Sequence, residues 1–448
     1  MPALNKVLAA VLLTAAVQAC TDGPVEPESL IAQVRKLAYE RNLTAIEGVP
    51  PVRPALVTLG QALAFDKILS GNRDIACMTC HLPAMGTGDG RAIPVGQGGT
   101  GLGPDRTHPE GARTLRHSPP LFNLHLTRKF LWDGRVEVLN TGSIRTPAGD
   151  QLTRQMEDVF EFGVFSAQPL FPVEVREEMR GPGNALAAVP DGDFTELWSR
   201  LMDRLGAIRE YRELFEAAYP DTEFDDMTFA HASNAMAGFL ASALTFTRSP
   251  WDRFLAGDDD QLTTAALRGA RDFMTVGCTD CHETPQFDGA PGNEFHNDGL
   301  AQFGPGVGDG VSGRDDFGRE RVTNDRADRR RFVTRPLRNI ELTAPYGHVG
   351  QFATLKSFVE HYNDVDARLL EYDIAANVAD PELWSTLLDN FGAILVNRDT
   401  LLLGIRFEEA TTKDLIEFLH ALTDEAARDL RGIIPERVPS GLPIDRIR

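Results

Sequence analysis

Two pentapeptides contain four of the five cysteines in this 448-residue chain. They are Cys77-Met78-Thr79-Cys80-His81 and Cys278-Thr279-Asp280-Cys281-His282. C-x-x-C-H is the spacing at which two thiols form thioether bonds with a haem while the adjacent histidine ligates its iron. A zinc or redox C-x-x-C site, or a four-cysteine metal site, is the alternative, but it does not explain a histidine after both pairs. The motifs therefore predict two covalently bound c-type haems, with His81 and His282 as iron ligands.

The fifth cysteine, Cys20, follows an N-terminal export signal. Lys6 precedes an apolar run at 7–17, which is too short to span a bilayer. The block AVQAC at 16–20 resembles a bacterial lipobox, in which Cys20 would carry a lipid anchor. Ordinary cleavage near this point is the alternative. Lipidation at Cys20 and ordinary cleavage both predict an exported protein in the periplasm, the compartment in which bacteria attach c-type haems.

The charge balance limits the partners. Sixty-five acidic residues against 45 Lys and Arg give a formal net charge of −20. This charge argues against a nucleic acid or an anionic membrane surface as partner. A small basic electron-transfer protein would fit its sign, although acidity is also common among soluble exported proteins.

The hydrophobic periodicity predicts a mainly α fold, with long glycine-rich loops at 86–111 and 287–318 around the haems. We expect helices over 201–215, over 229–246 and from about Thr263, and few strands. A break at 249–252 divides two cytochrome c-like haem domains. The predicted organisation is a signal at 1–20, a first haem domain at 21–250, a second at 251–425 and a peripheral tail at 426–448.

Several blocks around the haem motifs occur in a characteristic order. They are LGQALAFD at 59–66, RHSPPLFN at 116–123, WDGR at 132–135, SPWDRFLAGD at 249–258 and PLRNIELTAPY at 336–346. Together they resemble the bacterial di-haem cytochrome c peroxidase family, which includes the MauG-type enzymes. The resemblance implies that the haem at His81 is the site of peroxide chemistry and the haem at His282 an electron-transfer centre.

The resemblance also implies catalytic residues. The family has a glutamine and a glutamate ten residues apart, the latter followed by methionine, which Gln168 and Glu178 match. A carboxylate there takes a proton from one peroxide oxygen and returns it to the other, while the amide orients the peroxide. Glu177 is the rival carboxylate. Trp132 resembles the tryptophan that relays electrons between the haems, although a large core aromatic would give the same pattern.

The second ligand of the His282 haem distinguishes the subfamilies. Thr354 is expected to cap a helix whose apolar face carries Leu355, Phe358, Val359 and Tyr362. Ordinary family peroxidases have a methionine ligand at the position of Tyr362, and MauG-type members have a tyrosine. A phenolate ligand would lower the reduction potential of the second haem. A buried core tyrosine with a hydrogen-bonded hydroxyl is the alternative.

Two further family features match less well. Some members rest with a histidine on the peroxide haem, but His108 lies too far from the first motif, so we expect an open haem that needs no reductive activation. The family binds calcium between its domains, and Thr343 and Pro345 match two of its carbonyl ligands. The third ligand, an asparagine, is His117 here, a poor ligand for calcium.

The leading interpretation is a di-haem peroxidase that reduces hydrogen peroxide with electrons from a small redox protein, either a cytochrome c or a cupredoxin. The first alternative is a MauG-like enzyme, whose peroxide-derived high-valent haems oxidise a partner protein or another substrate. The second alternative is a di-haem electron-transfer protein without catalysis.

Overall fold

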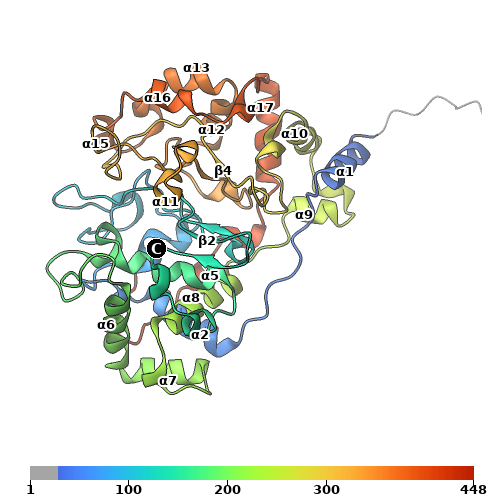
Figure 1. Cartoon of the computed structure of the whole chain (residues 1–448). Coiled ribbons are helices and arrows are strands. Elements are labelled where there is room, and N and C mark those ends of the chain that lie inside the picture. The colour runs from blue at the N-terminus through green and yellow to red at the C-terminus, as the bar shows by residue number, and fades with distance from the viewer. Residues whose placement is uncertain (1–28, 448) are drawn as a thin grey trace, which may run out of the picture.

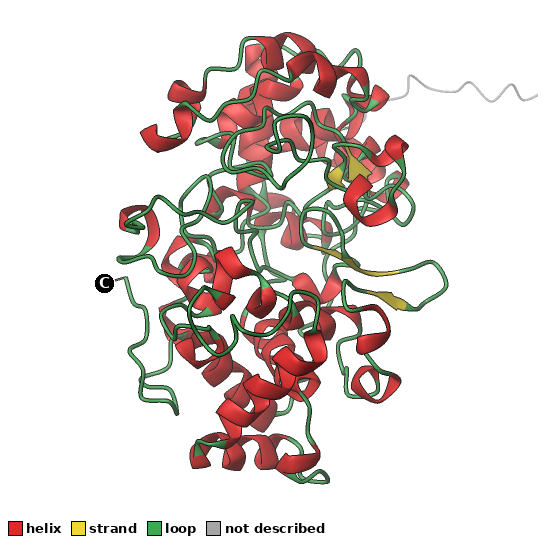
Figure 2. Cartoon of the chain, turned by 60° about the vertical axis from the view of Figure 1, so that its left-hand side comes forward, coloured by secondary structure: helices red, strands yellow, loops and turns green. Residues whose placement is uncertain are grey.

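The computed structural model describes residues 29–447, so the predicted signal and Cys20 lie outside the described residues. The chain forms two helical halves stacked end to end, the first mainly blue to green and the second mainly yellow to red in Figure 1, with the blue N-terminal helix beside the second half. Helices occupy both ends of the molecule, while loops and short strands cross its middle (Figure 2). Within 29–447, no helix is both long and apolar enough to cross a membrane.

Helix α1 (Leu30–Glu40) comes first. The first half then contains α2 (Pro54–Phe65), α3 (Cys77–Cys80), α4 (Arg154–Glu157), α5 (Val164–Ala167), α6 (Phe194–Gly206), α7 (Arg209–Ala218) and α8 (Phe229–Ala243). The second half contains α9 (Pro250–Leu255), α10 (Thr264–Thr275), α11 (Glu320–Thr323), α12 (Leu355–Tyr362), α13 (Val365–Leu370), α14 (Ile374–Asn377), α15 (Pro381–Trp384), α16 (Phe391–Val396) and α17 (Glu409–His420). The strands are β1 (Lys129–Phe130), β2 (Val136–Val138), β3 (Ile144–Arg145), β4 (Phe295–His296) and β5 (Phe332–Val333).

Each half is built on a pair of helices that cross at a glycine. In the first half, α2 crosses α8 at Gly60, where a Cβ would lie 1.9 Å from the carbonyl oxygen of Ala235. In the second, α10 crosses α17 at Gly269, where a Cβ would lie 1.8 Å from the carbonyl oxygen of Asp414. Only glycine allows this approach of the two backbones. In both halves the glycine-bearing helix precedes the haem motif in the sequence.

Each half also has its own apolar core. The first contains residues of α2, α5, α6 and α8, and the second contains residues of α9, α10 and α17. Val34 and Ala38 of α1 belong to the second core. Helix α1 therefore packs on the second half, although its position in the sequence led us to include it in the first domain.

The halves meet at a hairpin. Strands β1 and β2 pair antiparallel, with Phe130 opposite Val136, and the turn between them contains Trp132. The carbonyl of Trp132 accepts a hydrogen bond from the Val333 amide of β5, at 2.9 Å. Arg319 of the second half donates to the fully buried Glu137 of β2 at 2.8 Å. These contacts hold Trp132 at the junction of the two halves.

The mainly α fold class, the helix that follows Thr263 and the helix capped by Thr354 are confirmed. The single helix predicted over 201–215 is wrong. It divides into α6 and α7, because Ile208 is extended, with φ −105° and ψ 110°. The break follows Gly206, a poor helix former whose missing Cβ leaves room for the Phe224 ring. The residues 249–252 also differ from the expected break, since Ser249 caps α9.

The C-terminal segment is fixed to the first half, in contrast to the peripheral tail that we expected. Ser440 donates to Asp66 at 2.6 Å, and Lys67 donates to Asp445 at 2.6 Å. Asp445 also accepts from Thr79, inside the first haem motif. These contacts connect segments more than 360 positions apart, so no local pattern could have revealed them.

Candidate active site

The first haem motif forms a short helical turn, α3, which ends in His81. The Nδ1 atom of His81 lies 2.9 Å from the carbonyl oxygen of Thr87. Burial lowers the pKa of His81 to about 4, so the ring is neutral near pH 7. A neutral imidazole that donates from Nδ1 leaves Nε2 free to bind a metal. The local geometry thus fits a histidine ligand.

The second haem motif repeats this arrangement. A helical turn at Cys278–Asp280 precedes His282, whose Nδ1 bonds to the carbonyl oxygen of Phe287. Burial lowers the pKa of His282 to about 4. Thr87 and Phe287, which provide the two carbonyls, both adopt positive φ angles, of 63° and 57°. The same backbone turn therefore orients both histidines.

The four motif cysteines suit covalent attachment of haem. All four are free thiols, and each lines a cavity together with its histidine. Burial raises the pKa of Cys77 to about 11 and that of Cys278 to about 12, so both are neutral thiols. In the described part of the chain, no three His, Cys, Asp or Glu side chains converge as metal ligands. The donor set therefore fits two haems and does not form a four-cysteine metal site.

Gln168 and Glu178 line the same cavity as His81, about 650 Å³ in volume. Gln168 begins a turn of 3₁₀ helix at Gln168–Leu170, and Glu178 lies in one turn of π-helix at Arg176–Arg180. Single π turns often occur at functional sites. The two residues that the motif pairs in sequence thus face one space together with the first haem motif.

The backbone around Glu178 is held on two sides. The Gly71 amide donates to the carbonyl of Met179 at 2.8 Å, and the Gln97 amide donates to the carbonyl of Glu178 at 3.0 Å. A Cβ at Gly96 would lie 1.8 Å from the carbonyl oxygen of Glu177. The glycines let neighbouring loops approach closely enough to fix this turn.

Glu178 differs from its neighbour Glu177 in exposure. Both line the cavity, but Glu177 is exposed, whereas Glu178 is half-buried. Burial raises the pKa of Glu178 to about 7; Glu174 and Glu177 reinforce this effect and Arg135 opposes it. A carboxyl group with a pKa near 7 exchanges protons readily at neutral pH. This property favours Glu178 over Glu177 as the residue that handles protons.

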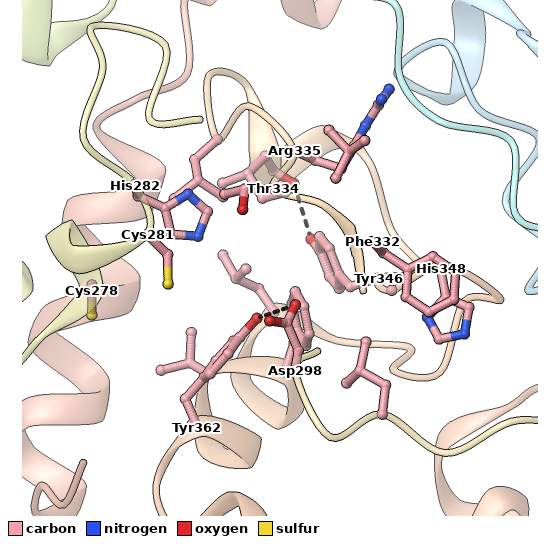
Figure 3. Close-up of a pocket in the computed structure, with 18 of the residues that line it drawn as sticks. Cys278, Cys281, His282, Asp298, Phe332, Thr334, Arg335, Tyr346, His348 and Tyr362 are labelled. Carbon is pink, nitrogen blue, oxygen red and sulfur yellow. Dashed lines mark hydrogen bonds between the residues drawn. The ribbon is translucent and has the colours of Figure 1, made fainter. Parts of the chain in front are cut away.

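The second cavity is closed by a tyrosine. Leu355, Phe358, Val359 and Tyr362 all line it, as the predicted apolar face of α12 requires. Figure 3 shows Tyr362 and His282 on opposite sides of an open space, with Cys278 and Cys281 at its edge. Tyr362 donates to Asp298 at 3.4 Å. Burial raises the pKa of Tyr362, and the charge of Asp298 raises it further.

Sequence reasoning missed Asp298, which contacts both residues at the end of α12. His361 lies 2.8 Å from its backbone carbonyl through Nε2, and Tyr362 bonds to its carboxylate. Burial raises the pKa of Asp298. Asp298 and Tyr362 are 64 positions apart, and no local pattern relates them.

Trp132 lines both cavities, as do His117 and Arg335. The Trp132 Nε1 donates to the His117 carbonyl at 2.8 Å. The neighbouring Asp133 forms an ion pair with Arg116 at 2.7 Å. Arg116 also forms an ion pair with Asp316 of the second half, at 2.7 Å. Although burial opposes it, Arg135 and Arg116 lower the pKa of Asp133. Trp132 is thus held rigidly between the two cavities.

The residues considered for haem blocking and for calcium have other contacts. The Nδ1 of His108 accepts from the amides of Glu110 and Ala112, within its own loop. His117 uses Nδ1 against the carbonyls of Arg91 and Ala92, so it does not replace the missing asparagine ligand. Thr343 and Pro345 line the second cavity. A calcium site there stays a prediction from the resemblance.

Comparison with known proteins identifies the family. A model of the di-haem cytochrome c peroxidase family matches residues 54–260. The chain is 28% identical to cytochrome-c peroxidase IdrP2 of Pseudomonas sp. (strain SCT), over 73% of this chain and 78% of that protein. It is 30% identical to the methylamine utilization protein MauG of Methylorubrum extorquens, over 70% of this chain and 69% of that protein.

The fold is also that of solved relatives. The crystal structure of a MauG-like protein associated with microbial copper homeostasis superposes with a TM-score of 0.58. Its sequence is 23% identical, and the match covers 88% of this chain and 96% of that one. The chain therefore belongs to the di-haem cytochrome c peroxidase family, which includes MauG, and is an oxidoreductase with two c-type haems.

Proposed function

We propose that the protein is a periplasmic enzyme that reduces hydrogen peroxide to water at the haem of His81. The observation that carries the proposal is the half-buried carboxyl group of Glu178, which lines the same cavity as His81 and has a pKa of about 7. The bound haem supplies the electrons that break the oxygen–oxygen bond. Two electrons and two protons convert one peroxide into two water molecules.

The residues of the first cavity manage the protons. Glu178, when ionised, takes the proton from one peroxide oxygen and returns it to the other, which then leaves as water. Gln168 lines the same cavity, and its amide would hold the peroxide. His81 donates its Nδ1–H to the carbonyl of Thr87, so that only Nε2 is free to bind the iron.

The electrons arrive from the second half of the molecule. His282 and Tyr362 would bind the second haem from opposite sides, and Trp132 lies between the two cavities as the coupling residue. A small redox protein, a cytochrome c or a cupredoxin, supplies the electrons from outside. A lipid on Cys20 would hold the enzyme at the membrane surface.

Replacement of Glu178 tests the proposal. Glu178→Gln keeps the shape but removes the base, so kcat/KM for peroxide should fall by about 10²- to 10⁴-fold. In the native protein this constant should rise with pH up to about pH 7, because the carboxyl group must be ionised to accept the proton. The variant should lose this pH dependence.

Glu177→Gln is the matched control, since it removes an adjacent exposed carboxylate. It should leave the rate within a few-fold of the native value. Both variants must carry two haems per chain. Unchanged peroxide turnover in Glu178→Gln would instead favour an electron-transfer protein.

A second function is favoured by the ligands available to the second haem. Tyr362 lines the second cavity, and no methionine of the described chain does. A phenolate ligand lowers the potential of a haem, which makes it a poor acceptor of electrons from a cytochrome. This observation supports a MauG-like role, in which the oxidising equivalents of peroxide pass to a partner protein.

Stopped-flow spectroscopy separates the two functions. The protein is mixed with peroxide while both haems are ferric. A rapid spectral change without prior reduction supports the MauG-like role. A requirement for one reduced haem supports the peroxidase that is fed by a redox protein.

A further inference from the structure

Arg335 occupies the wall between the two cavities. It lines both of them, and its guanidinium lies 5.4 Å from the centre of the Trp132 ring. In Figure 3 its side chain extends away from His282 and Tyr362, toward the ribbon of the first half. Arg335 therefore reaches from the second half of the molecule toward the first cavity.

The guanidinium of Arg335 has no partner of opposite charge. Its Nε and Nη1 atoms are buried, and neither forms a hydrogen bond with any residue in the range 29–447. Asp288, whose charge acts on Arg335, is bonded to Thr284 instead. Burial lowers the pKa of Arg335 to about 10. A charge held away from water without a partner is unfavourable, so the buried nitrogens of Arg335 are suited to bind an anion.

Two neighbouring arginines have acidic partners. Arg116 binds Asp133 and Asp316, and Arg338 binds Asp252 at 2.8 Å. Arg335 differs from these two arginines because it forms no ion pair within residues 29–447. Its position at the edge of two haem cavities indicates a haem propionate as its partner, because each haem carries two propionate carboxylates.

We propose that Arg335 binds a propionate of the haem held by His81 and so fixes that haem against Trp132. Arg335 lines the cavity of His81, and its side chain points away from His282 and Tyr362. This direction assigns the contact to the first haem. A guanidinium binds a carboxylate through two parallel hydrogen bonds, which fixes orientation as well as position. The inference rests on the two haems of the proposed function and is independent of the reaction with peroxide.

Spectroelectrochemistry of the two-haem protein tests this contact. Arg335→Gln removes a positive charge beside the first haem, which disfavours its ferrous state. At a fixed potential, the ferric-to-ferrous ratio of that haem should rise about tenfold, equivalent to a fall of 59 mV for a one-electron couple. The potential of the His282 haem should change less. Arg335→Lys, which keeps the charge, should restore most of the native value.

Arg326→Gln is the matched control, because it removes the same charge from an exposed site that lines neither cavity. It should leave both potentials unchanged. A native potential for the first haem in a fully loaded Arg335→Gln protein would overturn the proposal.

A crystal structure of the native two-haem protein decides the matter even if the variant fails to load haem. We expect a propionate oxygen within hydrogen-bonding distance of Nε or Nη1 of Arg335. A guanidinium bonded only to protein groups would overturn the inference and leave the proposed function intact. A native chain with fewer than two haems would overturn both.

Discussion

The two haem motifs have the same local structure, but the cavities above them differ. In both, a helical turn ends in a half-buried, neutral histidine whose Nδ1 bonds to a carbonyl of a residue with positive φ. His81 shares its cavity with Gln168 and Glu178. Opposite His282 lies Tyr362, bonded to Asp298. The two haem motifs are thus alike, while the residues that share their cavities differ.

The difference follows from the elements that cover each cavity. The first is covered by a loop and a single π turn, held at Gly71 and Gly96, which brings a carboxyl group near the motif without filling the space. The second is lined by the apolar face of the regular helix α12. An irregular turn thus lines one cavity, and a regular helix lines the other.

Exchange of Tyr362 for the methionine of ordinary family peroxidases should make the second site resemble theirs. As a ligand, Tyr362 would supply an anionic oxygen, and Tyr362→Met would replace it by a neutral thioether, which stabilises the ferrous state. The potential of the second haem should rise by an amount on the order of 0.1 V, within the span of about 0.8 V that axial ligands cover. Spectroelectrochemistry measures it.

Tyr346→Phe is the control in the same cavity, since the Tyr346 hydroxyl bonds only to the Ile340 carbonyl. It should leave the potential nearly unchanged. If Tyr362→Met also leaves the potential unchanged, Tyr362 is not a ligand.

The shared framework of the halves can be tested at its two helix crossings. Gly60→Ala and Gly269→Ala each place a Cβ within 2 Å of a backbone oxygen, so the helices must separate. Each should lower the free energy of unfolding by about 1–3 kcal/mol. Denaturant unfolding of the haem-loaded protein measures this change.

Gly392→Ala provides the comparison. Gly392 lies in α16, and no atom lies within 4 Å of the position its Cβ would take. This change should stabilise the protein slightly, by up to about 1 kcal/mol. Equal destabilisation at all three positions would contradict the role of the two crossings.

The parts of the site that the sequence predicts are those with a local pattern. The C-x-x-C-H spacing predicts both haem positions, and the periodicity after Thr354 predicts that Tyr362 faces inward. The contacts that sequence reasoning missed join distant segments: Asp298 to Tyr362, Arg335 to the first cavity, and Asp445 to Thr79. No repeat or spacing relates such pairs, because only the tertiary fold brings them together.

The central claim is that the two haems are unequal: the first has an open position and the second is ligated on both sides. Electron paramagnetic resonance of the protein with both haems ferric tests it most directly. We predict one high-spin signal from the His81 haem and one low-spin signal from the His282 haem, of which Tyr362→Phe changes only the second. Two signals of the same kind, or a low-spin signal that Tyr362→Phe leaves unchanged, would contradict the account.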